Sequence, residues 1–278
     1  MKPLTKVGAE HFVKSFASTP STVGIGVEEF LATNCIGPTT FIEGTARFEE
    51  FRDCLLREAD RSLSLSINCF ARSLEGLRAA SAYWTLVSLY YSSFYSAKAV
   101  LAMHGCWMTH PEMWVEVVDA NPGKQKLAYK TKRYARAGSH RVAWIAFYAA
   151  MNHLRSWFIT PHAKLASSPV NSIDTWLIDT RNEYNYEPDK AFQMKQEFDA
   201  SFDATNLPKC FGGKFRTMFE ISHSFVLFAR DMAIDLNLDT DVWAPKPTRK
   251  KWHQDFVTAP QDAAITALSS SYHPQLEY

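Results

Sequence analysis

The spacing of apolar positions predicts a chain made mostly of α-helices. Residues 45–66, 141–158 and 214–236 carry apolar side chains at steps of three and four, which gather on one face of a helix. The segment 77–105 is apolar over most of its circumference, so we expect it to be the central buried helix of a bundle. Its serines and alanines offer small faces where other helices approach closely, and Gly105 is a natural stop.

Few stretches show the alternation expected of strands, which favours an all-α fold. The chain has only 11 glycines, with no internal repeat, no glycine-rich phosphate loop and no alternation of strands with helices. We therefore predict a bundle of four or five long helices. The predicted organisation is a loop-rich N-terminal segment (1–42), a helical domain (43–240) with a basic insertion (106–140), and an extended C-terminal tail (241–278).

Near the end of one predicted helix, an arginine and a tyrosine stand five residues apart. The stretch WLIDTRNEYNYEPDK, residues 176–190, starts apolar and then turns polar. We expect this helix to be capped near Ser172 or Asp174. We expect it to end before Pro188, because proline disfavours the helical conformation of the residue before it.

The chain resembles the HEPN superfamily (higher eukaryotes and prokaryotes nucleotide-binding domains) in two features. A tyrosine- and alanine-rich helix ends in AKAVLAMHG, and a later helix carries TRNEYNYEP. HEPN proteins are all-α bundles marked by an arginine, often followed by a polar residue such as asparagine, with a histidine five positions after the arginine. The resemblance covers about residues 45–236 apart from the 106–140 stretch. Arg181 stands at the arginine position, Asn182 follows it, and Tyr186 takes the place of the histidine.

This resemblance implies a function in RNA chemistry. Many HEPN members are metal-independent ribonucleases that act as dimers, with two arginine–histidine motifs facing each other across a cleft. Branches with tyrosine in place of the histidine often look non-catalytic. For this chain the resemblance implies a homodimer, with Arg181, Asn182 and Tyr186 as the candidate catalytic residues. It also implies a place in a bacterial multiprotein system, such as antiviral defence or a toxin–antitoxin pair.

Metal-free RNA cleavage needs a group that removes the 2′-OH proton and a cation that holds the developing negative charge. Arg181 suits the second task, because a planar guanidinium binds phosphate oxygens with two hydrogen bonds. Histidine suits the first, whereas an unperturbed tyrosine has a pKa of about 10. Five residues rotate by about 500° along a helix, so Arg181 and Tyr186 share a cleft only if the helix end is irregular or a dimer partner completes the site.

A purely structural explanation of the same motif is also open. In that alternative, Arg181 pairs with a carboxylate at the helix end, and neighbouring tyrosines pack in the core. The carboxylates within reach are Asp179, Glu183 and Glu187, and the tyrosines are Tyr184 and Tyr186.

Two histidines bear on whether the chain is an enzyme. His104 and His153 lie on mostly apolar predicted helices, where a histidine is usually a hydrogen-bonded core residue, although either one could replace the missing motif histidine in space. The histidines show no HxH, HxxxH or HExxH spacing, and the five cysteines are scattered without a CxxC pair. We therefore predict no metal site, no cofactor and no disulfide framework.

A long stretch without acidic residues is the strongest electrostatic feature of the sequence. No Asp or Glu occurs between residues 120 and 173, although the whole chain has a net charge of only +1. This run predicts contact with RNA or another phosphorylated ligand, or with an acidic partner protein, and a solvated loop is the third alternative. The residues expected to bind nucleic acid are Lys124, Lys126, Lys130, Lys132, Arg133, Arg136 and Arg141.

Localisation follows from what the chain does not contain. The N-terminal residues form no apolar core of a signal peptide, and no apolar run reaches the roughly 18 residues that cross a membrane. Scattered cysteines fit a reducing compartment. We therefore expect a cytoplasmic protein without membrane contact.

Three hypotheses follow. The first is an HEPN-like component of a multiprotein system that binds RNA or a nucleotide through the basic run and Arg181 and does not cleave RNA alone. The second is a metal-independent endoribonuclease that uses Arg181, Asn182 and Tyr186. The third is a structural scaffold subunit whose basic run faces an acidic partner.

Overall fold

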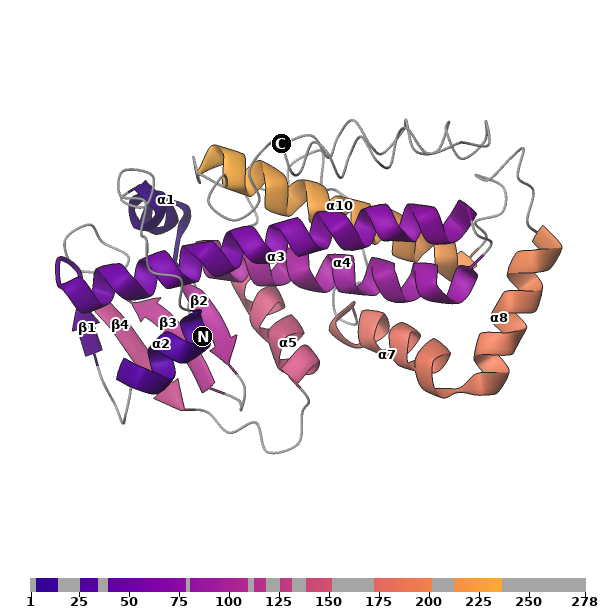
Figure 1. Ribbon diagram of the computed structural model, residues 1–278, viewed down its shortest axis with the longest axis horizontal. Coiled ribbons are helices and arrows are strands. Elements are labelled where there is room, and N and C mark those ends of the chain that lie inside the picture. Colours follow the sequence, from indigo (N-terminus) through magenta and orange to yellow (C-terminus); the bar gives the residue numbers. More distant parts are fainter. Residues whose placement is uncertain are drawn as a thin grey trace. The chain divides into compact units, whose positions relative to one another are not determined.

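The computed structural model shows a mostly helical chain (Figure 1). It describes residues 4–14, 26–34, 40–78, 81–109, 113–118, 126–131, 139–151, 173–201 and 213–236. The chain divides into two compact units. Among the described residues, unit 1 contains those up to Leu63, then 97–151 and 231–236, and unit 2 contains 64–96, 173–201 and 213–230.

Eight helices and four short strands form within these residues. The helices are α1 (Lys6–Lys14), α2 (Val27–Asn34), α3 (Ala46–Arg78), α4 (Ala82–Met103), α5 (Ser139–Met151), α7 (Ile173–Tyr186), α8 (Pro188–Ser201) and α10 (Gly213–Asp235). The strands are β1 (Thr40–Ile42), β2 (Cys106–Thr109), β3 (Met113–Val118) and β4 (Lys126–Thr131). The dominance of helix confirms the predicted all-α class, whereas the strands were not expected.

The strands form one antiparallel sheet in unit 1, in the order β1-β4-β3-β2. Three of them lie in the predicted insertion, and β1 comes from the predicted N-terminal segment. Gly105 joins α4 to the sheet with a φ of 73°, and its carbonyl accepts a hydrogen bond from the Val117 amide at 2.8 Å. A β-carbon at Gly105 would lie 2.9 Å from the Val117 Cβ, so this turn needs glycine for its conformation and for space.

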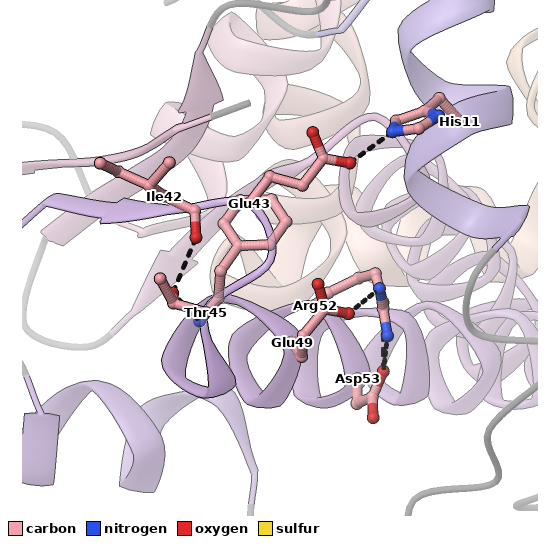
Figure 2. A network of polar contacts seen from close by, with 8 residues as sticks. His11, Ile42, Glu43, Thr45, Glu49, Arg52 and Asp53 are labelled. Atoms are coloured by element: carbon pink, nitrogen blue, oxygen red, sulfur yellow. Dashed lines mark hydrogen bonds and ion pairs between the residues drawn. The ribbon is translucent and has the colours of Figure 1, made fainter. Parts of the chain in front are cut away.

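The start of α3 is held by local polar contacts, shown in Figure 2. The Thr45 side chain accepts a hydrogen bond from the Phe48 amide at 3.4 Å and so caps the helix. The sequence predicted a helix that starts near this residue. Arg52 is buried and donates to Asp53 at 3.0 Å. Burial raises the pKa of Asp53 despite this arginine. His11 on α1 contacts Glu43, which lies just before α3.

The core of unit 1 is rich in aromatic side chains. Phe30 packs against Phe51 with ring centroids 6.0 Å apart, and Trp144 packs edge-on to Phe147 at 6.0 Å. All four side chains are fully buried. The first pair joins α2 to α3, and the second lies within α5, so aromatic side chains contribute much of the buried apolar area of this unit.

In unit 2, α3 and α4 run side by side and meet through buried serines (Figure 1). The Ser66 hydroxyl donates to the Ser92 carbonyl at 2.8 Å, and the Ser92 hydroxyl donates to the Ser66 carbonyl at 2.9 Å. Ser96 adds a hydroxyl 2.6 Å from that of Ser66. Small side chains allow this close approach, as the composition of the 77–105 segment predicted. On α10, Ser222 donates to the Leu89 carbonyl at 3.0 Å.

Candidate functional site

The helix that carries the arginine–tyrosine motif is α7. It begins at Ile173 and ends at Tyr186, so the predicted end before Pro188 is confirmed. After Glu187 the chain enters α8, whose first residue is Pro188. Proline suits a first helical position, because its missing amide hydrogen would have no partner there. The motif therefore lies on the last turns of α7, next to an abrupt break between two helices.

Two tyrosines of α4 reach across to α7. The Tyr83 hydroxyl donates to Asn185 Oδ1 at 2.6 Å, and Arg181 Nη2 donates to the Tyr91 hydroxyl at 3.1 Å. The earlier tyrosine meets the later residue of α7, so the two helices run antiparallel where they touch. These contacts, within unit 2, place the end of α7 against the first half of α4.

The guanidinium of Arg181 is surrounded by neutral partners. Its Nη1 donates to Asn182 Oδ1 at 3.0 Å, and its Cζ lies 5.7 Å, 5.8 Å and 5.5 Å from the ring centroids of Tyr90, Tyr91 and Tyr186. Such cation–π contacts are each worth about 0.5–1 kcal/mol at an exposed site. Burial lowers the pKa of Arg181, but the surrounding tyrosines raise it overall, so the side chain stays charged.

The carboxylates near this arginine are held elsewhere. Lys190 Nζ lies 3.4 Å from Glu183 Oε1 and 2.9 Å from Glu187 Oε2, and the hydrogen bond to Glu187 raises the pKa of Lys190. Within the described part of the chain, Arg181 forms no ion pair. Tyr186 is 69% exposed, so it does not pack in the core. The structural alternative for the motif is therefore not the arrangement that forms.

Arg181 and Tyr186 share one place although they stand five residues apart on one helix. Their backbones differ by about 140° around an ideal helix axis. The guanidinium nevertheless lies 5.5 Å from the Tyr186 ring centroid. The long arginine side chain and the position of Tyr186 as the last residue of α7 bridge this angle within a single chain.

Exposed aromatic side chains extend the site along α4. Trp84 is 63% exposed, and its ring lies 5.1 Å from that of Tyr83. Contacts join Trp84 to Tyr83, Tyr83 to Asn185, and Tyr186 to Arg181, and Asn185 and Tyr186 are consecutive residues. We name the connected group the Arg181 surface, and it consists of Tyr83, Trp84, Tyr91, Arg181, Asn182, Asn185 and Tyr186. Sequence reasoning found Arg181, Asn182 and Tyr186 but missed the four other members.

The structure describes the basic run only in part. Lys126 and Lys130 lie on β4, where Lys130 is the register partner of Trp114 on β3. Arg141 is exposed near the start of α5. The remaining predicted nucleic-acid-binding residues, Lys124, Lys132, Arg133 and Arg136, lie outside the described residues. Strand β4 and α5 both belong to unit 1.

His104 is a core residue. It is fully buried, and its Nδ1–H donates to the Leu4 carbonyl at 2.7 Å while Nε2 lies 3.2 Å from the Met232 sulfur. Burial lowers the pKa of His104 to about 4. Because the ring is fully buried, a ligand does not reach it, and His104 does not replace the missing motif histidine. His153 lies outside the described residues.

The described thiols are protonated, and the described acidic side chains form no cluster for a metal ion. Burial raises the pKa of Cys69 to about 11 and raises the pKa values of Cys54 and Cys106 as well. Among the described residues, no group of three or more His, Cys, Asp or Glu side chains is placed to hold a metal ion. In the same part of the chain, no helix combines the length and apolarity that a membrane crossing requires.

No protein-family model matches the sequence, and no curated protein or solved structure matches it either. The resemblance to the HEPN superfamily therefore rests on the residues of this chain alone.

Proposed function

We propose that this chain is an HEPN-like protein that binds RNA or a nucleotide through the Arg181 surface and does not cleave RNA by itself. The observation that carries the proposal is the charged Arg181 guanidinium, whose partners among the described residues are three tyrosines and an asparagine rather than a carboxylate. An arginine held in place by neutral groups keeps its charge for an anionic ligand.

Phosphate is the anion that this arrangement suits. A guanidinium offers five N–H donors in a fixed plane and binds phosphate oxygens in pairs. Tyr91 and Asn182 hold the Arg181 side chain from two sides, which reduces the rotamer entropy lost on binding. The resemblance to nucleotide-binding HEPN domains supports the same ligand.

The exposed rings of the Arg181 surface suit nucleobases. Tyr186 and Trp84 are 69% and 63% exposed. Stacking of a base on an aromatic side chain contributes about 1–3 kcal/mol and tolerates any base. Proteins that bind single-stranded nucleic acids combine cations with exposed aromatic rings in this way.

Negative charge near Arg181 would repel an anionic ligand, and part of it is compensated by neighbouring positive charge. Lys190 is within ion-pair distance of both Glu183 and Glu187, which reduces their repulsion. The negative end of the α7 dipole also lies at this site, but the positive end of the α8 dipole begins two residues later and opposes it. The remaining acidic residues Asp179 and Asp189 are exposed and are screened by salt.

Binding of a labelled single-stranded RNA to wild type and Arg181→Ala tests the proposal by fluorescence anisotropy. A lost charge-assisted contact costs about 1.5–3 kcal/mol, so we expect about 10- to 150-fold weaker binding. Arg72→Ala is the matched control, because Arg72 is an exposed arginine of unit 2 that pairs with Glu75. Equal affinity of all three proteins, or no binding by wild type, would overturn the proposal.

A second candidate is the metal-independent endoribonuclease, which the proximity of Arg181, Asn182 and Tyr186 favours. Against it, the described contacts of Arg181 include no imidazole that would act as the base. Incubation of an RNA pool with the protein in EDTA separates the two candidates. Fragments ending in 2′,3′-cyclic phosphate with wild type, absent with Arg181→Ala, would establish cleavage. Intact RNA in both would leave binding without catalysis.

A further inference from the structure

We infer that the Arg181 surface recognises the phosphodiester of RNA through the side-chain N–H groups of Arg181, Asn182 and Asn185, and that Tyr83 is the positioning residue that turns Asn185 into one of these donors. The inference rests on the proposed function and adds to it the donors that bind the phosphodiester and the residue that orients one of them. It follows from the direction of each hydrogen bond at the end of α7.

The orientation of the Asn182 amide is fixed by its partner. A guanidinium only donates, so the atom that Arg181 Nη1 contacts at 3.0 Å must be the amide oxygen of Asn182. The acceptor of Asn182 is therefore satisfied within the protein. Its Nδ2 group, with two hydrogens to donate, remains for a ligand.

Asn185 repeats this arrangement one turn later. Its Oδ1 accepts the Tyr83 hydroxyl at 2.6 Å, a short and well-formed hydrogen bond. Its Nδ2 group is again left as a donor. Asn182 and Asn185 stand three residues apart on α7, so their side chains lie on neighbouring positions of the same helix face.

Arg181 adds further donors beside these amides. Two of its N–H groups bind Tyr91 and Asn182. Its Nε is buried and so out of reach of a ligand. Each terminal nitrogen carries a second N–H, and these two donors are the ones left for a phosphate oxygen.

A cluster of N–H donors favours a ligand that offers several acceptors close together. The phosphodiester oxygens of every nucleotide meet this condition, because they carry lone pairs and no hydrogen. Base edges meet it less uniformly, since adenine and cytosine present amino donors beside their acceptors. The bases are then left to stack on Tyr186 and Trp84, which makes binding independent of sequence.

Three labelled oligomers of equal length test this inference: oligouridylate, oligoadenylate and a methylphosphonate-linked, uncharged uridylate. The proteins are wild type, Tyr83→Phe, Asn185→Asp and Gln196→Glu. Asn185→Asp replaces the donor group by a charged acceptor while keeping a partner for Tyr83. Gln196→Glu is the matched control, because it makes the same chemical change at an exposed position of α8.

We expect wild type to bind oligouridylate and oligoadenylate with affinities within about threefold of each other, because stacking tolerates every base. The uncharged oligomer should bind wild type at least about 30-fold more weakly than oligouridylate. Asn185→Asp should bind either charged oligomer at least about 30-fold more weakly than wild type does. Tyr83→Phe should weaken binding by about 3- to 10-fold, the effect of one neutral hydrogen bond, while Gln196→Glu stays near wild type.

Other results have separate meanings. If wild type binds RNA but Asn185→Asp binds equally well, or if one base is preferred more than about tenfold, recognition of the phosphodiester by these donors is wrong and RNA binding stands. If wild type binds none of the oligomers, the proposed function and this inference fail together. Thermal unfolding of each variant shows that its fold is intact.

Discussion

Burial of His104 ties the stability of unit 1 to pH. In the folded chain its pKa is lowered to about 4, whereas an exposed histidine in the unfolded chain has a pKa of about 6.5. A proton therefore binds more tightly to the unfolded state. The stability contributed by neutral His104 is fully present above about pH 6.5 and is lost as the pH falls toward 4.

We expect the free energy of unfolding to fall by about 2 kcal/mol between pH 7 and pH 5 through this residue. Urea unfolding at the two pH values measures the change. His104→Gln is the comparison, because glutamine does not titrate and still has an amide donor for the Leu4 carbonyl. A variant that loses as much stability as wild type would show that other groups dominate the acid response.

At the same scale, the sequence predicted part of the Arg181 surface. Arg181, Asn182 and Tyr186 could be found because they follow one another in a short motif. Tyr83 and Tyr91 could not, because they contact α7 from 102 and 90 residues away along the chain. Tyr83 and Tyr91 stand eight residues apart on α4, a spacing close to two helical turns. This spacing was the one sequence signal that the two tyrosines share a helix face.

The turn between α3 and α4 depends on the small size of Gly76. Its carbonyl accepts the Ser81 amide at 2.8 Å, which brings the end of α3 to the start of α4. A β-carbon at Gly76 would lie 2.5 Å from Thr85 Oγ1. Alanine is intrinsically better than glycine in a helix by about 1 kcal/mol, so two effects of opposite sign compete at this position.

We expect the steric effect to win, with Gly76→Ala lowering the free energy of unfolding by about 1–3 kcal/mol, the usual cost of overpacking. Chemical denaturation measures the loss. In a Thr85→Ala background the obstructing oxygen is gone, so Gly76→Ala should become neutral or stabilising there. The same loss in both backgrounds would mean that the contact with Thr85 is not the cause.

At the scale of elements, the long helices were predictable, whereas the strands were not, and neither were the short helices α1 and α2 in the predicted loop-rich segment 1–42. The segment 77–105 became α4 (Ala82–Met103), and 214–236 became α10 (Gly213–Asp235), because their periodicity is sustained over many residues. The strands have three to six residues, too few for periodicity to be distinct. Strand β1 pairs with β4 across more than 80 residues, a contact that no local pattern encodes.

For the whole molecule, the proposed RNA binding can be assigned to one unit or to both. Arg141 is exposed in unit 1, whereas the Arg181 surface belongs to unit 2. The logarithm of the affinity falls as the logarithm of the salt concentration rises. Each cation that contacts a phosphate of single-stranded RNA makes this slope steeper by about 0.7.

If the basic run contacts the same RNA as Arg181, we expect Arg141→Gln to make that slope shallower by about 0.7. Anisotropy titrations at several potassium chloride concentrations give the slope. Arg72→Gln serves as the comparison, because it removes an exposed arginine whose charge is shared with Glu75. An unchanged slope for Arg141→Gln would assign RNA binding to unit 2 without this residue.

The two units also constrain how this gene can change. Each unit is assembled from separate stretches of sequence. Within the described residues, the chain crosses from one unit to the other between Leu63 and Ser64, between Ser96 and Ala97, and between Arg230 and Asp231. These three crossings fall inside α3, α4 and α10, so each of them divides a continuous helix. Exchange of one continuous segment between related genes would therefore not transfer a whole unit.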